Sequence, residues 1–308
     1  MTKHVAVLMG GWSAEREVSL VSGQACADAL ASEGYDVSII DPPRDLHAIA
    51  DALCPQNGGK APDVVFNALH GRYGEDGTIQ AVLDIARIPY THSGLLASAI
   101  AMSKPIALGM FRSAGIPVPN GMVIPPEELG KGDPMSRPYV VKPAREGSSV
   151  GVYIVQEGDN GPDFSDWTFG DALVEEYIPG RELTVAVRDD EALGVTELRP
   201  LSGFYDYTNK YTDGCTEHLC PAPISEIIAK QCQEYAIEAH KLLGCDGISR
   251  SDFRFDDINH DPGRIVLLEV NTQPGMTPLS LVPEQAAKLG MPFGKLVSWM
   301  VENARCPD

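Results

Sequence analysis

Residues 5–40 of the chain, VAVLMGGWSAEREVSLVSGQACADALASEGYDVSII, decide the fold of its N-terminal region. The apolar run Val5–Met9 predicts a buried strand, and Tyr35–Ile40 predicts the next strand. Between them, a helix is predicted from about Ala14 to Ser32, with Ser13 as its N-cap. Strand, helix and strand in this order predict a βαβ unit with parallel strands. The turn after the first strand lacks the GxGxxG spacing, so we do not predict a dinucleotide site there.

The pattern continues beyond this unit with a further strand over Asp63–Leu69 and a helix over Thr78–Ala86. Together these elements predict a Rossmann-like α/β domain that ends near Ser93. Ser103 is a good N-cap for a following helix that carries Pro105 in its first turn, where proline is tolerated.

The middle of the chain predicts a small antiparallel lobe. Its three strands are expected over Tyr139–Lys142, Val150–Val155 and Ala172–Ile178. The proline-rich segment Ile116–Pro126 is expected to be irregular.

The C-terminal part predicts more strands and a capped helix. The helix runs from Ser225, its N-cap, to about Leu243. The polar, aromatic segment Tyr205–Leu219 has no periodicity and predicts a long loop of the kind that is usually functional or disordered. Four strands are expected, over Leu183–Arg188, Leu193–Leu198, Ile248–Phe255 and Arg264–Asn271.

Composition narrows the class of protein. The chain has 308 residues, 44% of them hydrophobic and 22% charged, which is ordinary for a globular protein of two or three domains. The formal net charge of −19 makes nucleic acid and membrane surfaces poor partners. No apolar run reaches the ~18 residues of a spanning helix, and no secretory signal is visible. The seven cysteines are never spaced Cys-x-x-Cys, which favours reduced thiols in a cytoplasmic protein.

The last two predicted strands carry the most telling side chains. Because side chains alternate along a strand, Arg250 and Asp252 share one face, as do Glu269 and Asn271. If the strands pair, Asp252, Glu269 and Asn271 converge as hard oxygen ligands that suit magnesium. The alternative is a solvated strand face with a cross-strand ion pair. The following tight turn, Thr272–Met276, favours the functional interpretation because its backbone N–H groups can stabilise an oxyanion.

Two segments of the middle lobe have the composition of a nucleotide site. In KPAREGSSVGV, residues 142–152, a strand ends in lysine and a loop of small residues follows, so backbone N–H groups can approach phosphates. The alternative there is a plain hairpin turn. In VEEYIPGRE, residues 174–182, a strand runs into a Pro-Gly turn that can hold an adenine edge and ribose hydroxyls. The alternative is an interdomain hinge with surface acids.

The loop HGRYGEDG, residues 70–77, follows a strand and opens a helix, which is where open α/β sheets bind ligands. His70 at the strand end is therefore a candidate site residue. Glu15 lies in the first turn of the first predicted helix. An acidic residue there is also explained by its favourable interaction with the helix dipole, without any role in a site.

Six blocks together resemble one family, the D-alanine–D-alanine ligases of the ATP-grasp superfamily. The resemblance runs from Gly10 to Pro283. The blocks are GGWSAEREVSL, HGRYGEDGTIQ, KPAREGSSVGV, YDYTNKY, GISRSDF and LEVNTQPGMT.

The resemblance implies a Rossmann-like N-terminal domain over residues 1–100, a central ATP-grasp lobe over 101–182 and a C-terminal lobe over 183–308. It implies a cytoplasmic, ATP-consuming enzyme that joins two D-alanine molecules for peptidoglycan synthesis. It also implies two Mg²⁺ ions, which Mn²⁺ can replace, and a homodimer. Ser103 departs from the family, whose members usually carry Asp before the residue matching Lys104; both are good N-caps.

The resemblance also implies roles for individual residues. Glu15 would bind the ammonium of the first D-alanine, and Arg250 with the Gly275 N–H would hold the oxyanion. Tyr205–Leu219 would be a mobile loop that closes the site. The other implied substrate contacts are His70, Ser280 and Leu281. The implied ATP contacts are Lys104, Lys142, Ser148, Glu175, Tyr177, Ile178, Glu182 and Lys210. Tyr211 would hydrogen-bond Ser148 and Glu15, and Asp252, Glu269 and Asn271 would bind the metal ions.

Three rival functions are weighed against this one. The nearest is a ligase that takes D-serine or D-lactate as its second substrate, and Tyr211 argues against D-lactate. A second is a carboxylate–amine ligase of purine metabolism, which the HGRYGEDG block disfavours. The third is a non-catalytic nucleotide-binding regulator, which would not need the metal trio together with Arg250.

Overall fold

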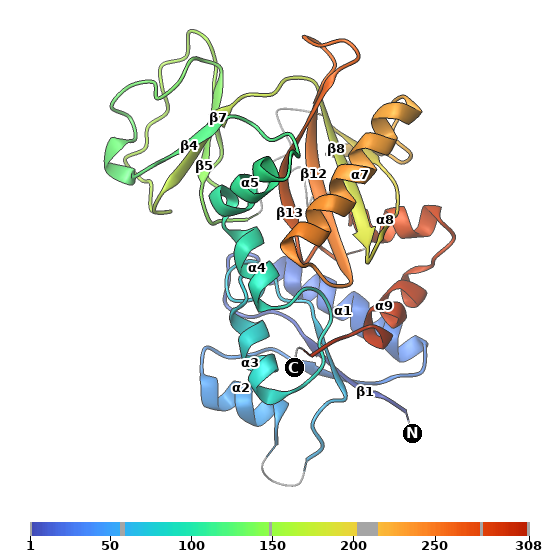
Figure 1. The fold of residues 1–308 in the computed structure, drawn as a ribbon. Coiled ribbons are helices and arrows are strands. Elements are labelled where there is room, and N and C mark those ends of the chain that lie inside the picture. Colours follow the sequence, from blue (N-terminus) through green and yellow to red (C-terminus); the bar gives the residue numbers. More distant parts are fainter. Residues whose placement is uncertain (1, 56–58, 148–149, 202–214, 278–279, 307–308) are drawn as a thin grey trace.

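The computed structural model describes residues 2–55, 59–147, 150–201, 215–277 and 280–306. Three sheets organise these residues (Figure 1). A three-stranded sheet lies in the N-terminal part, a four-stranded sheet forms a separate lobe, and a six-stranded sheet builds the C-terminal part. No single helix in the described ranges is long and apolar enough to cross a membrane, although the bent pair 95–102 and 104–113 passes together by length and composition.

The N-terminal sheet is parallel, in the order β2-β1-β3, and this confirms the predicted βαβ unit. In its central strand, Val5 pairs with Val37 on one side and Val64 on the other, and the apolar side chains of this strand are fully buried. The elements of this part are β1 (His4–Leu8), α1 (Arg16–Ser32), β2 (Asp36–Ile40), α2 (Leu46–Leu53), β3 (Val64–Asn67), α3 (Thr78–Ala86) and α4 (Leu95–Met102).

Helix α1 begins two residues later than predicted, and Ser13 is not its N-cap. The Ser13 hydroxyl donates to the carbonyl of His70 at 2.6 Å and accepts from the N–H of Glu15 at 3.2 Å. The hydroxyl is therefore used to join two loops, and Glu15 itself lies at the N-terminus of the helix.

The small lobe is an antiparallel sheet in the order β4-β7-β5-β6, as predicted. The expectation that residues 116–126 are irregular was wrong for Gly121–Ile124, which form β4 because they pair with β7. The first strand residue after the small-residue loop is Tyr153, so β6 is shorter than the predicted strand. The elements are β4 (Gly121–Ile124), η1 (Pro126–Glu128), β5 (Tyr139–Pro143), β6 (Tyr153–Val155) and β7 (Ala172–Glu176).

The C-terminal sheet has the order β11-β10-β8-β12-β13, with β9 beside β8. The predicted loop Tyr205–Leu219 was wrong at its end, because Thr216–Leu219 form β11 by pairing with β10. The predicted strand Leu193–Leu198 is displaced to Thr196–Pro200. The elements are β8 (Arg181–Arg188), β9 (Glu191–Ala192), β10 (Thr196–Pro200), β11 (Thr216–Leu219), α7 (Glu226–Leu243), β12 (Ile248–Asp256), β13 (Arg264–Asn271), α8 (Leu281–Lys288) and α9 (Phe293–Glu302).

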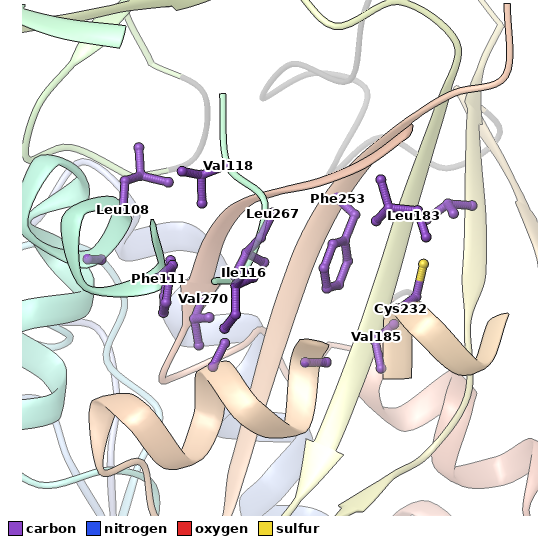
Figure 2. Close-up of a cluster of buried hydrophobic side chains, with 14 of the residues drawn as sticks. Leu108, Phe111, Ile116, Val118, Leu183, Val185, Cys232, Phe253, Leu267 and Val270 are labelled. Atoms are coloured by element: carbon purple, nitrogen blue, oxygen red, sulfur yellow. The ribbon is translucent and has the colours of Figure 1, made fainter. Parts of the chain in front are cut away.

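Helices α5 (Lys104–Ser113) and α7 close the apolar side of this sheet (Figure 2). Phe111 and Ile116 pack with Phe253 and Leu267, and all four are at most 1% exposed. Fully burying such a side chain contributes about 1.5–3 kcal/mol, so this cluster anchors the segment after α5 on the C-terminal sheet. Among the described residues the Ser103 side chain makes no capping hydrogen bond to α5, contrary to the prediction.

The last helix returns to the N-terminal part, where α9 lies beside α1 (Figure 1). Leu296 and Val297 of α9 are buried in one cluster with Val5 and Leu30. The proposed division into residues 1–100, 101–182 and 183–308 follows the three sheets. It remains a proposal, and α5 and α9 each pack against a part of the chain that it assigns to another domain.

Ser225 gives a direct test of the helix prediction. Its side chain accepts a hydrogen bond from the N–H of Ile228 at 3.3 Å and so caps α7, as the sequence predicts. Ser225→Ala is expected to lower the free energy of unfolding by about 1 kcal/mol in urea titrations. The control is Ser32→Ala, which removes an exposed hydroxyl that only bonds back to the carbonyl of Asp28. A loss no larger in Ser225→Ala than in this control would contradict the capping role.

Candidate active site

Strands β12 and β13 form the floor of the site. They pair antiparallel as predicted, with Asp252 opposite Glu269 and Arg250 opposite Asn271. The alternate residues of β12, Ser251 and Phe253, are fully buried on the other face. The three residues proposed as metal ligands therefore lie together on one face of the sheet.

Arg250 and Asp252 form a bidentate pair on this face. The Nε and Nη2 atoms of Arg250 donate to the two carboxylate oxygens of Asp252 at 2.8 and 2.7 Å. Thr184 Oγ1 of β8 also donates to Asp252 Oδ1 at 2.8 Å. Bidentate pairing fixes both side chains, so Asp252 is held in one orientation beside Glu269.

Lys104 joins the floor to the loop after β5. Its ammonium donates to the carbonyl of Glu146 at 2.5 Å and lies 3.3 Å from Glu269 Oε2. The lysine side chain is only 10% exposed, so its charge is held close to Glu269 with little screening by solvent. The structure thus places a cation where the two cavities described next meet.

The first cavity lies between the small lobe and the C-terminal sheet. Apolar walls come from Val140 and Ile154 of the lobe and Leu268 of β13. Ile178 also lines it, and the polar residues on its lining include Lys104, Lys142, Glu175, Glu176, Tyr177, Glu182, Asp252, Arg254 and Glu269. Apolar walls with a few polar groups are the usual lining of a site for a small molecule or cofactor.

A buried ion pair lies on the lining of this cavity. Lys142 Nζ and Glu175 Oε1 are 2.5 Å apart, and their side chains are 10% and 4% exposed. The other carboxylate oxygen, Glu175 Oε2, is buried and has no hydrogen-bond partner among the described residues. Because buried polar atoms are nearly always hydrogen-bonded, this acceptor fits a donor supplied by a ligand, such as an exocyclic amine.

Arg254 is a site residue that the sequence reasoning missed. It donates to the carbonyls of Ile178 at 3.1 Å and Gly180 at 2.8 Å, and its Nη1 atom lies 3.5 Å from Glu182 Oε2. It thereby holds the turn that follows β7 in place. The sequence contained a signal for it, because side chains two positions apart along a strand share a face. Arg254 therefore follows Arg250 and Asp252 on the same face of β12.

Glu176 at the edge of the same cavity is held in its charged form. Burial alone would raise its pKa, but hydrogen bonds from Arg264 at 2.7 Å and from the N–H of Asn120 at 2.9 Å lower the pKa below the usual value. Glu176 is therefore ionised, and its charge is balanced by the Arg264 guanidinium at this edge of the cavity.

The second cavity lies between the N-terminal part and the C-terminal sheet. It shares Lys104, Glu146, Gly147 and Glu269 with the first cavity, so the two adjoin at these residues. The other proposed site residues on its lining are Glu15, His70, Arg250, Asn271, Gly275, Ser280 and Leu281.

The Glu15 carboxylate lies against two glycine-containing loops. A Cβ atom added to Gly71 would lie 2.5 Å from Glu15 Oε2, and one added to Gly147 would lie 3.5 Å from it. Gly71 also has a φ of +70°, a conformation that suits glycine. Glu15 is 8% exposed and lines the second cavity, so its charge can recognise a cationic group of a substrate.

His70 and Ser280 are each held by local hydrogen bonds. His70 Nδ1 lies 3.1 Å from Glu75 Oε1, and its Nε2 lies 3.1 Å from the hydroxyl of Ser22. The Ser280 hydroxyl accepts from the N–H of Thr277 at 2.9 Å. A Cβ atom on Gly275 would lie 2.9 Å from that hydroxyl, so the turn before Ser280 is tight at this glycine.

Three of the predicted site residues, Ser148, Lys210 and Tyr211, lie outside the described residues, as do residues 205–214 of the predicted mobile loop. All the other predicted site residues line one or both of the two cavities. Their roles remain proposals.

Comparisons with known proteins identify the family of the chain. Residues 41–93 match the family model described as D-ala D-ala ligase N-terminus, and residues 110–302 match D-ala D-ala ligase C-terminus. The D-alanine–D-alanine ligase of Granulibacter bethesdensis is 56% identical over 99% of this chain and 98% of its own length. That of Parvibaculum lavamentivorans is 55% identical with the same coverage.

Solved structures are similar over nearly the whole chain. The D-alanine–D-alanine ligase from Bacillus anthracis has a TM-score of 0.81 at 31% identity and covers 98% of this chain and 97% of its own. The VanG D-Ala:D-Ser ligase from Enterococcus faecalis has a TM-score of 0.78 at 30% identity, with 98% of this chain and 99% of its own covered. The fold is the mixed α/β and α+β ATP-grasp fold that the sequence predicts, and the chain belongs to the D-alanine–D-alanine ligase family.

Proposed function

We propose that this protein is an enzyme that uses ATP to join two D-alanine molecules into D-alanyl-D-alanine for peptidoglycan synthesis, through an acyl-phosphate intermediate. The observation that carries the proposal is the junction of the two cavities at Lys104, Gly147 and Glu269. One cavity has the form of a nucleotide site, and the other presents Glu15 and Arg250 to a small zwitterion. A phosphoryl group can pass between them only where they meet.

ATP use is supported by the cavity and by a relative. The B. anthracis ligase complexed with ATP has a TM-score of 0.78 at 28% identity and covers 98% of this chain. We infer that adenine lies between the apolar walls, with its amine donating to Glu175 Oε2 and its edge against the Tyr177-Ile178 backbone. Glu182 would then bind the ribose, and Lys104 and Lys142 would offset the phosphate charge.

The residues proposed for magnesium have suitable donor chemistry. Asp252 and Glu269 are adjacent carboxylates, and Asn271 adds an amide oxygen on the same face. Among the described residues no group of three or more His, Cys, Asp or Glu side chains is placed to hold a metal ion. Mg²⁺ suits such a sparse set because it keeps waters and phosphate oxygens as ligands. When bound, two such ions would neutralise charge on the transferring phosphate, and Mn²⁺ can replace them.

The chain's own residues then account for the chemistry. Glu15 binds the ammonium of the first D-alanine, with His70 beside it, and so orients its carboxylate toward the junction. A carboxylate oxygen of that D-alanine attacks the γ-phosphorus, which gives an acyl phosphate and ADP.

The amine of the second D-alanine, which Ser280 and Leu281 bind, attacks the acyl carbon. Arg250 and the Gly275 N–H stabilise the resulting oxyanion. Phosphate leaves with the carboxylate oxygen, the amine loses a proton, and the products are the dipeptide, ADP and phosphate. We propose that Ser148, Lys210 and Tyr211 complete the site, that the part of the predicted loop before β11 closes it against water, and that the enzyme acts as a cytoplasmic homodimer.

The direct test is phosphate release from ATP and Mg²⁺ with D-alanine, with the product identified by mass. Phosphate release and the dipeptide are expected with D-alanine and not with L-alanine. D-serine and D-lactate supplied with D-alanine test the second position, and D-alanine is expected to outcompete both. No release with any amino acid would contradict the proposal, whereas preferential formation of a mixed product would change only the second substrate.

A further inference from the structure

A buried pair of side-chain amides joins two walls of the second cavity. Gln273 is 1% exposed and Asn67, at the end of β3, is 0% exposed. The Oε1 atom of Gln273 accepts from Asn67 Nδ2 at 2.6 Å, and its Nε2 atom donates to the carbonyl of Leu69. We call Asn67 and Gln273 the amide clamp.

Each half of the clamp is attached to a different part of the proposed site. On one side, Leu69 directly precedes His70, and Asn67 Nδ2 also donates to the carbonyl of Gly74, so the clamp holds both ends of the 70–74 loop. On the other side, the backbone N–H of Gln273 donates to Asn271 Oδ1 at 2.8 Å. Gln273 thus bonds to one proposed metal ligand and, through its side chain, to the loop that carries His70.

A second link runs parallel to the clamp. The Ser22 hydroxyl of α1 lies 3.1 Å from His70 Nε2 and accepts from the N–H of Met276 at 3.4 Å. The turn over residues 272–276 is therefore tied to the N-terminal part through side-chain hydrogen bonds at both ends. Residues 67 and 273 are 206 positions apart, so only the tertiary fold brings the clamp together.

The position of the clamp gives it a specific effect on geometry. Glu15 and Gly71 lie on the N-terminal side of the cavity, and Asn271 and Gly275 lie on the side of the C-terminal sheet. The first group is proposed to hold the first D-alanine, and the second group is proposed to hold the phosphate metals and the oxyanion. A misplacement of about 1 Å between such groups can lower a rate about 10²-fold.

We infer that Gln273 is a positioning residue that fixes the first-substrate wall relative to the metal and oxyanion wall. The inference rests on the proposed function, because it assigns the clamp to the alignment of the D-alanine carboxylate with the transferring phosphate. Neither clamp residue lines either cavity, so the clamp acts through the segments that it joins, and its loss is expected to change KM for D-alanine more than KM for ATP.

The test compares two buried glutamines. Gln273→Met removes both clamp bonds with little change in side-chain volume. Gln285→Met is the matched control: Gln285 is 0% exposed, and its amide bonds to Ala186, Thr184 and Thr196 lie within the C-terminal part. Both variants lose hydrogen bonds of a buried amide, so both are expected to lower Tm.

Only Gln273→Met is expected to lower kcat, by about 10–100-fold when kcat is normalised to the concentration of ATP-binding sites. This variant is also expected to raise KM for D-alanine, whereas its KM for ATP stays within about twofold of the parent value. Hydrogen exchange of residues 68–75 is expected to quicken in Gln273→Met and not in Gln285→Met. Equal kcat losses in the two variants, or unchanged exchange in that segment, would overturn the positioning role.

The exchange measurement needs no substrate, so it separates the two proposals. If the parent protein forms no dipeptide, the proposed function fails while exchange still decides whether the clamp holds the 70–74 loop. If the parent protein is active and Gln273→Met keeps its kcat, the positioning role fails while the proposed function stands.

Discussion

Replacing Glu269 by alanine is expected to lower kcat for dipeptide formation about 10³-fold. Glu269 lines both cavities, lies opposite Asp252 and is 3.3 Å from the Lys104 ammonium. Its loss removes one of the two carboxylates proposed for the metal ions and leaves the buried lysine with less compensating charge. Losing one preorganised electrostatic group at a reacting centre typically costs about 10²–10³ in kcat, and Glu269 serves in two such interactions.

The matched control is Glu302→Ala. Glu302 also pairs with a lysine, Lys3 at 2.7 Å, but on the surface of the N-terminal part with half of its side chain exposed. Steady-state ADP release should stay within about twofold of the parent protein in this control, because exposed ion pairs contribute little. A Glu269→Ala enzyme that turns over within threefold of the parent would remove Glu269 from the proposed site.

Lys142→Ala is expected to lower kcat/KM for ATP by about 10²–10³ and to lower Tm as well. The lysine supplies charge for the phosphates, and it pairs with Glu175 at 2.5 Å in a place where both side chains are buried. Removing it leaves a buried, unpaired carboxylate, which typically costs about 3–5 kcal/mol.

Stability and activity can be separated with a second substitution. Adding Glu175→Gln to Lys142→Ala removes the unpaired charge and is expected to recover most of the lost Tm while kcat/KM for ATP stays low. Glu175→Gln alone is the control, since it keeps Lys142 with an acceptor beside it, and it should be at least about 30-fold more active than the double variant. Return of activity together with Tm in the double variant would mean that Lys142 acts only on the fold.

The parts of the site that follow strand alternation were predictable from the sequence. The period of two in β12 and β13 places Asp252, Glu269 and Asn271 on one face once the strands pair, and the pairing is observed. The cap of α7 by Ser225 was also predictable, because a helix cap, like the alternation of side chains along a strand, depends on residues that are close together in the chain. The resemblance to the ligase family added residues such as Lys104, which has no local pattern of its own.

Other features had no local signal. Residues Thr216–Leu219 are mostly polar and become a strand because β10 offers an edge for pairing. The hydroxyl of Ser13 was expected at a helix terminus but bonds to the carbonyl of His70, far away in the sequence. The contact between Asn67 and Gln273 likewise exists only in the folded chain. Polar side chains choose among several partners, and tertiary packing decides which partner is present.

The central claim, that the D-alanine carboxylate is phosphorylated at the junction of the two cavities, has one direct test. The enzyme is incubated with ATP, Mg²⁺ and D-alanine labelled with ¹⁸O in its carboxylate, and the released phosphate is analysed by mass. An acyl phosphate transfers one carboxylate oxygen to phosphorus, so the account predicts one ¹⁸O atom in each phosphate formed with the dipeptide. Unlabelled phosphate released in step with the dipeptide would contradict it.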